Sequence, residues 1–139
     1  MRRNCKCRLL FLLAGFVLVG CAESSTHGTV NGTVTLDDQP LAEGTVRFVP
    51  VDGASQTASA MVTDGKFTAV VPLGRMRVEF SAPKVVGRHR MYDTPNSPVV
   101  DDVVERLPPR YNVQSELTLD VQAAQQDAPF ELYSGSSGS

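Results

Sequence analysis

Few side chains in this chain have the chemistry of catalysis or metal binding. The 139 residues include three cysteines and two histidines. His27 lies in a short polar stretch, and His89 lies between Arg88 and Arg90, whose charges repel a metal cation. The sequence has no HExxH pattern and no paired histidines, which leaves no ligand set for zinc, and a hydrolytic triad would depend on His89 alone. We therefore expect no enzyme activity, no metal and no cofactor.

The acidic residues offer a calcium site at one place at most. Asp101 and Asp102 are followed by Glu105, but the stretch lacks the glycine turn and the alternating oxygen ligands of a calcium-binding loop. These three carboxylates therefore predict a solvated acidic surface.

A compact basic patch is formed by Arg88, His89 and Arg90, with Tyr92 close behind. As a functional site, these four residues would contact an anion or ligand: a phosphate, a lipid headgroup or an acidic glycan. The other interpretation, which we favour, is a solvated segment whose charges pair with nearby carboxylates. The candidate partners are Asp93, Asp101 and Asp102.

The charge distribution argues against nucleic acid as a partner. The first 20 residues hold four bases and no acid, so the rest of the chain has nine bases against fifteen acids. An acidic surface repels the phosphate backbone, and a chain without tryptophan has few aromatic rings on which bases can stack.

The N-terminal segment has the organisation of an export signal. A basic start is followed by an uncharged apolar run from Leu9 to Gly20, which as a helix would span about 18 Å, well short of a bilayer core of about 30 Å. We predict a signal peptide over residues 1–20. Cys5 and Cys7 would be removed with it, and the single remaining cysteine, Cys21, cannot form an internal disulfide.

The residues Leu18-Val19-Gly20-Cys21 resemble the bacterial lipobox, the motif read by lipoprotein signal peptidase. The resemblance implies that Cys21 is diacylated and becomes the first residue of the mature chain, held to the membrane by its lipid. The protein would then be exported and lipid-anchored to the cell envelope, facing the periplasm or lying on the outer surface. Ordinary secretion, with Cys21 as a free thiol, is the alternative.

Beyond the anchor, the pattern is that of β-strands. After a predicted tether over residues 21–27, short runs alternate apolar and polar residues and are separated by turns, which is typical of an antiparallel sandwich or barrel. We expect about seven strands and no helix over residues 28–133, with a disordered tail at 134–139. The inward side chains are predicted to be Val30, Val34, Leu36, Val46, Phe48, Ala58, Ala60, Val62, Met76, Val78, Phe80, Leu117, Leu119, Val121, Phe130 and Leu132, whereas Arg75, Arg77 and Glu79 should face outward.

One long segment, residues 83–114, interrupts this pattern before the last two strands and is predicted to be a loop. Within it, Val99 to Leu107 is compatible with a short helix or with an edge strand. Pro108 stiffens the chain that leads to Tyr111, which we expect to act as a structural anchor between the loop and the sandwich.

Several motifs together carry a family resemblance. The stretches VNGTVTLDDQPLAEGTVRFVP, TDGKF, PLGRMRVEF and LPPRYNVQSELTLDV occur in an order that resembles small secreted lipoproteins of planctomycete bacteria. Those proteins have a carboxypeptidase regulatory-like, or transthyretin-like (prealbumin-like), β-sandwich domain. The resemblance covers Val30 to Leu132 and implies an accessory, non-catalytic domain with the transthyretin-like fold.

These observations predict a structural or protein-interaction module of the cell envelope, with the membrane and envelope proteins as partners. Such a module should expose a sheet edge or an apolar patch. The alternative is a small-ligand or glycan-binding module that uses the segment 83–114, with a concave site lined by Arg88, Arg90 and Tyr92.

Overall fold

The computed structural model describes residues 25–135, and its regular structure is almost entirely β-strand. The predicted signal peptide, the lipidation site Cys21 and the residues 136–139 of the predicted tail lie outside this range. One turn of 3-10 helix, η1 (Pro109–Tyr111), interrupts the strands. The strands are β1 (His27–Leu36), β2 (Gln39–Pro40), β3 (Glu43–Pro50), β4 (Ala58–Thr63), β5 (Lys66–Pro72), β6 (Gly74–Ser81), β7 (Pro83–Arg90), β8 (Val99–Glu105), β9 (Thr118–Val121) and β10 (Gln126–Leu132).

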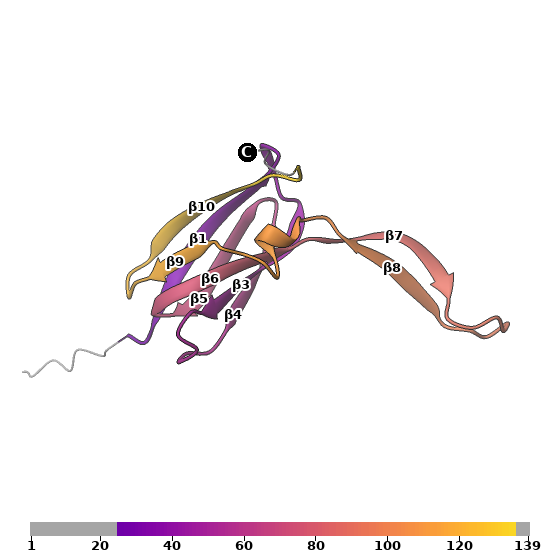
Figure 1. The fold of residues 1–139 in the computed structure, drawn as a ribbon, viewed down its shortest axis with the longest axis horizontal. Helices are drawn as coiled ribbons and strands as arrows, with labels where there is room; N and C mark the ends of the chain where they lie inside the picture. Colours follow the sequence, from indigo (N-terminus) through magenta and orange to yellow (C-terminus); the bar gives the residue numbers. More distant parts are fainter. Residues whose placement is uncertain (1–24, 136–139) are drawn as a thin grey trace, which may run out of the picture.

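Eight of the strands form one curled sheet in the order β10-β1-β5-β4-β3-β6-β9, with the short β2 also paired to β1. Strands β4 and β5 share a single ladder pair, Thr63 with Lys66 at their hairpin, so the sheet folds over at this point. Figure 1 shows the resulting body, in which β10, β1 and β5 are folded back on β4, β3, β6 and β9. The predicted all-β, sandwich-like fold is confirmed.

The core lies on the concave side of the curled sheet and is built from the alternating apolar residues. Phe48 and Phe80 are fully buried, as are most of the predicted inward valines. Aromatic contacts join the two halves: the rings of Phe80 and Phe130 lie 5.0 Å apart edge to face, and those of Phe48 and Phe67 lie 6.0 Å apart. Because successive side chains point to opposite faces of a strand, one apolar residue in two is enough to line this core.

The predicted turn at Asp64-Gly65 is a tight two-residue connection between β4 and β5. Asp64 has φ of 50° and Gly65 has φ of 71°, the left-handed conformations that a primed turn requires. A Cβ on Gly65 would lie 2.8 Å from the carbonyl oxygen of Val34 and 2.9 Å from Cβ of Pro40. Glycine is therefore needed here for two reasons, its backbone conformation and the lack of space.

Strand β10 departs from the expected antiparallel pattern. It pairs with β1 in parallel, from Val30 opposite Gln126 to Leu36 opposite Leu132. The chain leaves β9 at one end of the body and enters β10 from that same end, so β10 runs in the same direction as β1. Alternation predicts which side chains face inward but not the direction of a strand relative to its neighbour.

The segment predicted to be a long loop is in large part regular. Residues 83–105 form a second, two-stranded antiparallel sheet of β7 and β8, which projects from the body (Figure 1). Of the two alternatives for Val99 to Leu107, the strand is correct, since β8 covers most of this stretch. The expectation of a loop is therefore wrong for the residues that form β7 and β8. The projecting hairpin, residues 83–105, is called the arm below.

Candidate functional site

The arm is positioned by continuous strand pairing and a compact tip. Its register runs from Pro83 opposite Glu105 to Arg90 opposite Val99, with one bulge at Val86. At the tip, the amide of Met91 donates to the carbonyl of Pro98 at 3.0 Å. Several turn-forming residues at the tip, among them two prolines and an asparagine, connect the strands.

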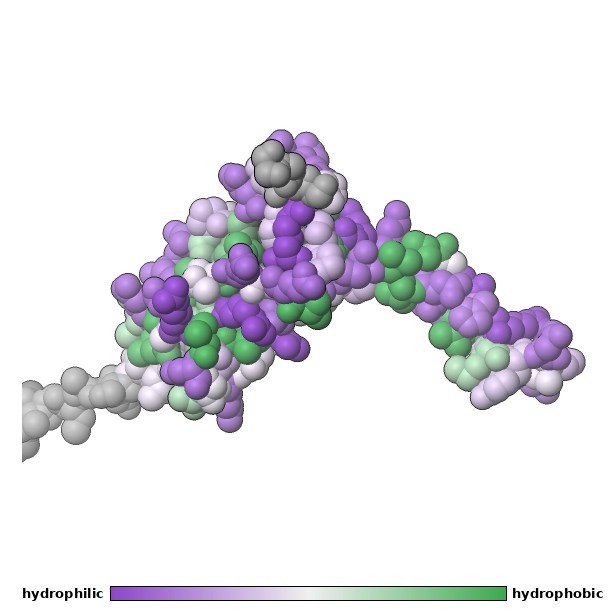
Figure 2. Space-filling model, in the orientation of Figure 1, coloured by the Kyte–Doolittle hydropathy of each residue, from purple (hydrophilic) through white to green (hydrophobic). Residues whose placement is uncertain are grey.

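Apolar side chains are unusually exposed on the arm. Of the twelve large hydrophobic residues that are exposed among residues 25–135, seven belong to the arm. The space-filling view in Figure 2 shows apolar surface on the arm where it leaves the body, and more along its length. These seven are Val85, Val86, Met91, Tyr92, Val99, Val103 and Val104.

The two strands of the arm have opposite charge. All charged residues of β7 are basic and all those of β8 are acidic. Arg88 Nε lies 2.7 Å from Asp101 Oδ1, and His89 Nδ1 lies 2.6 Å from Asp102 Oδ1. Both pairs join β7 to β8 and are solvent-exposed, so each contributes little to stability.

The four residues predicted to contact a ligand do not converge on one point. Arg88, His89 and Arg90 are consecutive on a strand, so Arg88 and Arg90 point to one face of the arm and His89 points to the other. Tyr92 lies beyond the strand, at the tip, and is 62% exposed. Two of the three basic residues have carboxylate partners, as the second sequence interpretation expected.

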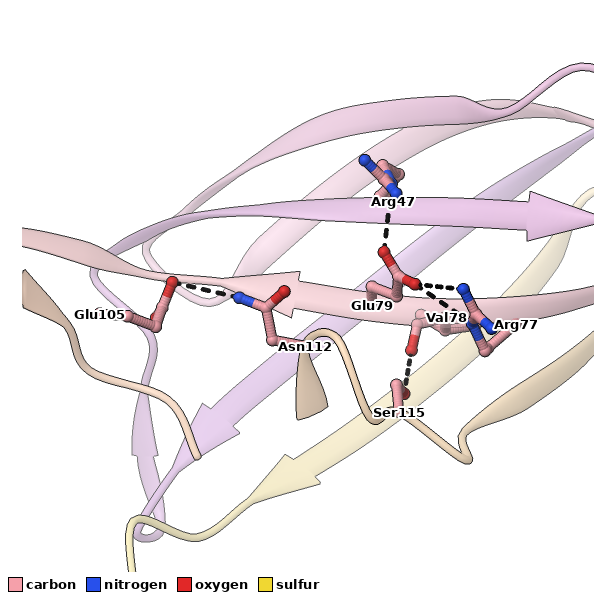
Figure 3. Close-up of polar contacts among 7 residues, drawn as sticks. All are labelled: Arg47, Arg77, Val78, Glu79, Glu105, Asn112 and Ser115. Carbon is pink, nitrogen blue, oxygen red and sulfur yellow. Dashed lines mark hydrogen bonds and ion pairs between the residues drawn. The ribbon is translucent and has the colours of Figure 1, made fainter. Parts of the chain in front are cut away.

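The root of the arm is held by the carboxylate of Glu105. It accepts hydrogen bonds from Ser81 Oγ at 2.6 Å and from the amides of Ala82 at 2.8 Å and Leu107 at 3.0 Å. Asn112 Nδ2 donates at 3.3 Å to Oε2, the same oxygen that accepts from Ser81 (Figure 3). Partial burial alone would raise the pKa of Glu105, but these hydrogen bonds outweigh burial and lower it, so the carboxylate is the form that holds the root.

Glu79, on the neighbouring stretch of β6, is buried rather than exposed. The outward position predicted for it is correct as to face, but the outer surface of β6 is covered here and the residue is only 8% exposed. Arg47 Nε lies 3.1 Å from one carboxylate oxygen, and Arg77 donates to the other from Nη2 at 2.6 Å and from Nε at 3.1 Å (Figure 3). Ser115 lies beside this part of β6, where its hydroxyl donates to the carbonyl of Val78 (Figure 3).

The carboxylate of Glu79 is contacted on both of its oxygens. Both carboxylate oxygens of Glu79 are occupied by guanidinium donors, and among residues 25–135 no buried side-chain nitrogen or oxygen lacks a hydrogen-bond partner. The carboxylate of Glu79 thus links Arg47 of β3 to Arg77 of β6.

Tyr111 joins the segment after the arm to the C-terminal strand. It is half-buried and packs against the core cluster, and its hydroxyl accepts a hydrogen bond from the amide of Tyr133 at 3.2 Å. The guanidinium of Arg110 lies 4.8 Å from the centre of its ring. Pro108 precedes this turn, and its carbonyl accepts the amide of Tyr111 at 3.0 Å. These contacts are the ones an anchor needs, and the contribution of Tyr111 to stability stays a prediction.

Ser134 and Gly135, the last two described residues, contact Asp37 and Arg110. Ser134 donates from its amide, at 2.9 Å, and from its hydroxyl, at 2.6 Å, to the carboxylate of Asp37. These hydrogen bonds lower the pKa of Asp37. The carbonyl of Gly135 accepts from Arg110. The predicted tail therefore begins with residues that contact the body.

Within the described part of the chain, no group of three metal-ligating side chains lies together. None of the helical structure in residues 25–135 is long and apolar enough to cross a membrane.

Comparison with known proteins gives no relative. No protein-family model matches the chain, and no curated protein or solved structure matches it significantly. The family resemblance noted in the sequence therefore stays a prediction.

Sequence reasoning missed strand β7 and left β8 as one of two alternatives, although a signal for both strands was present. Three pairs of adjacent valines flank the proline-rich tip segment, beginning at Val85, Val99 and Val103. Valine favours strands, and a turn-rich stretch between two valine-rich runs indicates a hairpin. The strict alternation used to find the other strands is absent, because neither face of the arm is buried.

Proposed function

We propose that the chain is a cell-envelope lipoprotein, anchored through lipid on Cys21, whose body presents the arm as a binding element for another protein. The observation that carries this proposal is the exposure of the arm. A two-stranded hairpin without a supporting layer is marginally stable in water, and this one exposes seven large apolar side chains. Protein-binding surfaces have this composition, an apolar centre beside charged residues.

The position of the arm agrees with an N-terminal anchor. Strand β1 begins at the end of the body that lies away from the arm, and the arm points in the other direction (Figure 1). A chain held by its N-terminus at a membrane would therefore extend the arm away from its attachment point, where other envelope proteins are accessible.

The experiment compares the full chain with an arm-shortened variant. In this variant residues 84–104 are replaced by an Asn-Gly turn, which keeps Pro83 and Glu105 as the last strand pair. We expect the variant to fold, because the described core includes no residue of the arm. Cross-linking in cells followed by affinity purification should recover partner proteins with the full chain and lose them with the variant. The same set of partners from both chains would contradict the proposal.

The anchor is tested separately with Cys21→Ala. Labelling of the full chain by radioactive palmitate should be abolished by this substitution, because the sulfur that receives the acyl group is gone. Labelling that survives would exclude Cys21 as the site.

A second candidate function, binding of a small ligand or glycan, is favoured by a cavity at the root of the arm. It has a volume of about 660 Å³, within the usual range for ligand sites, and lies between the arm and the β4–β5 turn. Lys84 and Arg106 give it positive charge, and Glu43 and Asp64 give it negative charge. Titration of the protein with envelope glycans, followed by NMR, should shift the amides of these residues if this function is the correct one.

A further inference from the structure

The two faces of the arm differ in composition. Residues that are opposite one another in the β7–β8 ladder share a face, and successive residues alternate between faces. One face, called the valine face below, carries the opposed pairs Val85–Val103, Arg88–Asp101 and Arg90–Val99. The other face carries Lys84–Val104 and His89–Val100, with Asp102 beside His89.

The valine face exposes apolar side chains to solvent. Val85 is 49% exposed, Val103 is 55% exposed and Val99 is 61% exposed. A sheet face with this much exposed valine is stabilised by a second layer about 10 Å away. The arm projects clear of the body (Figures 1 and 2), and no residue of the arm belongs to the core described within residues 25–135. The structure of these residues therefore includes no second layer over the valine face.

Two of the three opposed pairs on the valine face, Val85–Val103 and Arg88–Asp101, are complementary to themselves, whereas Arg90 would meet Val99. Consider two arms stacked on their valine faces and related by a two-fold axis that lies between them, parallel to the arms. Strand β7 of one copy then lies over β8 of the other, so each residue faces, in the second copy, the residue with which it pairs in its own ladder. Val85 then faces Val103 of a second copy, and Arg88 faces Asp101 of that copy. The other two-fold arrangement, with the arms pointing in opposite directions, places β7 on β7. When the arms overlap fully, it brings basic residues against basic residues and acidic against acidic ones.

We propose that a second copy of this chain covers the valine face, with the two arms stacked and pointing in the same direction. This inference rests on the proposed function and names the partner that the arm binds. The contact is isologous and closes as a dimer. Because both arms point the same way, strand β1 begins at the same end of the dimer in both copies, which suits two lipid anchors in one membrane.

Two neighbouring valines provide a matched test. Val103 lies on the valine face and is 55% exposed, whereas Val104 lies on the other face and is 53% exposed. The full chain is studied in detergent by sedimentation velocity over a range of concentrations, with excess empty micelles to prevent shared occupancy. We expect V103S to weaken dimerisation by about tenfold or more, since the lost apolar contact occurs twice in the dimer, and V104S to leave it unchanged. Equal effects of the two substitutions would overturn the proposal.

A charge-exchange test compares two single variants with their mixture. R88D leaves four carboxylates at the centre of the dimer, and D101R leaves four guanidinium groups, so each variant alone should be monomeric. Both variants also lose the ion pair within their own arm. Mixing them in equal amounts should restore a dimer that contains one copy of each, because every contact between the copies is again between opposite charges. A mixture that stays monomeric, or a single variant that dimerises as the unaltered chain does, would overturn the proposal.

These results separate this inference from the proposed function. A chain that is monomeric at all concentrations but recovers other proteins through its arm would refute the second copy as partner and leave the proposed function standing. A dimer that forms equally well without the arm would refute this inference as well. If the arm-shortened variant recovers all the partner proteins of the full chain, the proposed function is refuted.

Discussion

Strands β6 and β7 follow one another in the chain with Ala82 alone between them, yet they lie in opposite environments. Each contains two arginines and valine. Val78 of β6 is fully buried in the core, whereas Val85 of β7 is 49% exposed. The difference arises because β6 has a second layer of sheet across from it and β7 has none. Valine in a strand therefore indicates strand conformation, and burial requires a partner layer that the local sequence does not specify.

The same comparison holds for ion pairs. The carboxylates of Glu79 and Asp101 each contact an arginine, at 2.6 Å and 2.7 Å respectively. The side chain of Glu79 is 9% exposed and that of Asp101 is 44% exposed. Loss of both arginine partners would leave the buried carboxylate of Glu79 without a compensating charge, whereas water would replace the lost partner of Asp101. We therefore expect the ion pairs of Glu79 to contribute more to stability than the pair in the arm.

The largest effect is expected from the core. Phe80→Ala removes a fully buried ring that contacts Phe130, and should lower the free energy of unfolding by about 3–5 kcal/mol. Urea denaturation followed by circular dichroism measures the change. Met61→Ala, at a strand position that is 77% exposed, is the control and should stay within about 0.5 kcal/mol of the unaltered chain. Similar losses from both substitutions would show that Phe80 is not part of the core.

An intermediate effect is expected at the junction between arm and body. Tyr111→Ala removes a half-buried ring and the acceptor for the Tyr133 amide, and should lower the free energy of unfolding by about 2 kcal/mol, or the melting temperature by several degrees. Tyr111→Phe, which keeps the ring, should cost about 1 kcal/mol or less. An unchanged melting temperature together with lost ligand binding would instead make Tyr111 a binding residue.

A smaller, pH-dependent effect is expected at Glu105. Because its pKa is lowered in the folded protein, its contribution to stability is complete above the ordinary pKa of 4.5 and is lost as the pH falls through the lowered value. Glu105→Gln should cost about 1 kcal/mol at pH 7 and remove this part of the pH dependence. Thermal unfolding between pH 7 and pH 3 measures both. The control is Glu43→Gln, at an exposed strand end, and the prediction fails if the two variants behave alike.

The smallest effect on folding is expected within the arm. Val85→Ser removes a 49% exposed side chain that has no covering layer, so the free energy of unfolding should change by less than about 0.5 kcal/mol. The corresponding substitution in β6, Val78→Ser, should cost several times more because it places a hydroxyl in the core. Urea denaturation of both variants at low protein concentration tests the contrast. A large loss from Val85→Ser under these conditions would show that the arm and the body fold as one unit.

Much of the body was predictable from local patterns. The alternation in the strands around Val46, Phe48 and Val78 correctly identified their buried faces, and Asp64-Gly65 correctly identified the hairpin. The candidate site was predictable only in part. The basic residues at Arg88 to Arg90 were found, but their division between two faces follows from strand conformation, which the loop expectation did not include.

The sequence by itself determined which side chains alternate along each strand and where the chain turns, because both depend on the conformation of a few neighbouring residues. The tertiary structure alone decided that β10 lies parallel to β1, that Glu79 is covered although it faces outward, and that the arm has no second layer. These properties depend on which segments distant in the chain pack against one another. Packing is governed by the total apolar surface removed from water and by the space left for the chain, and no local pattern contains either quantity.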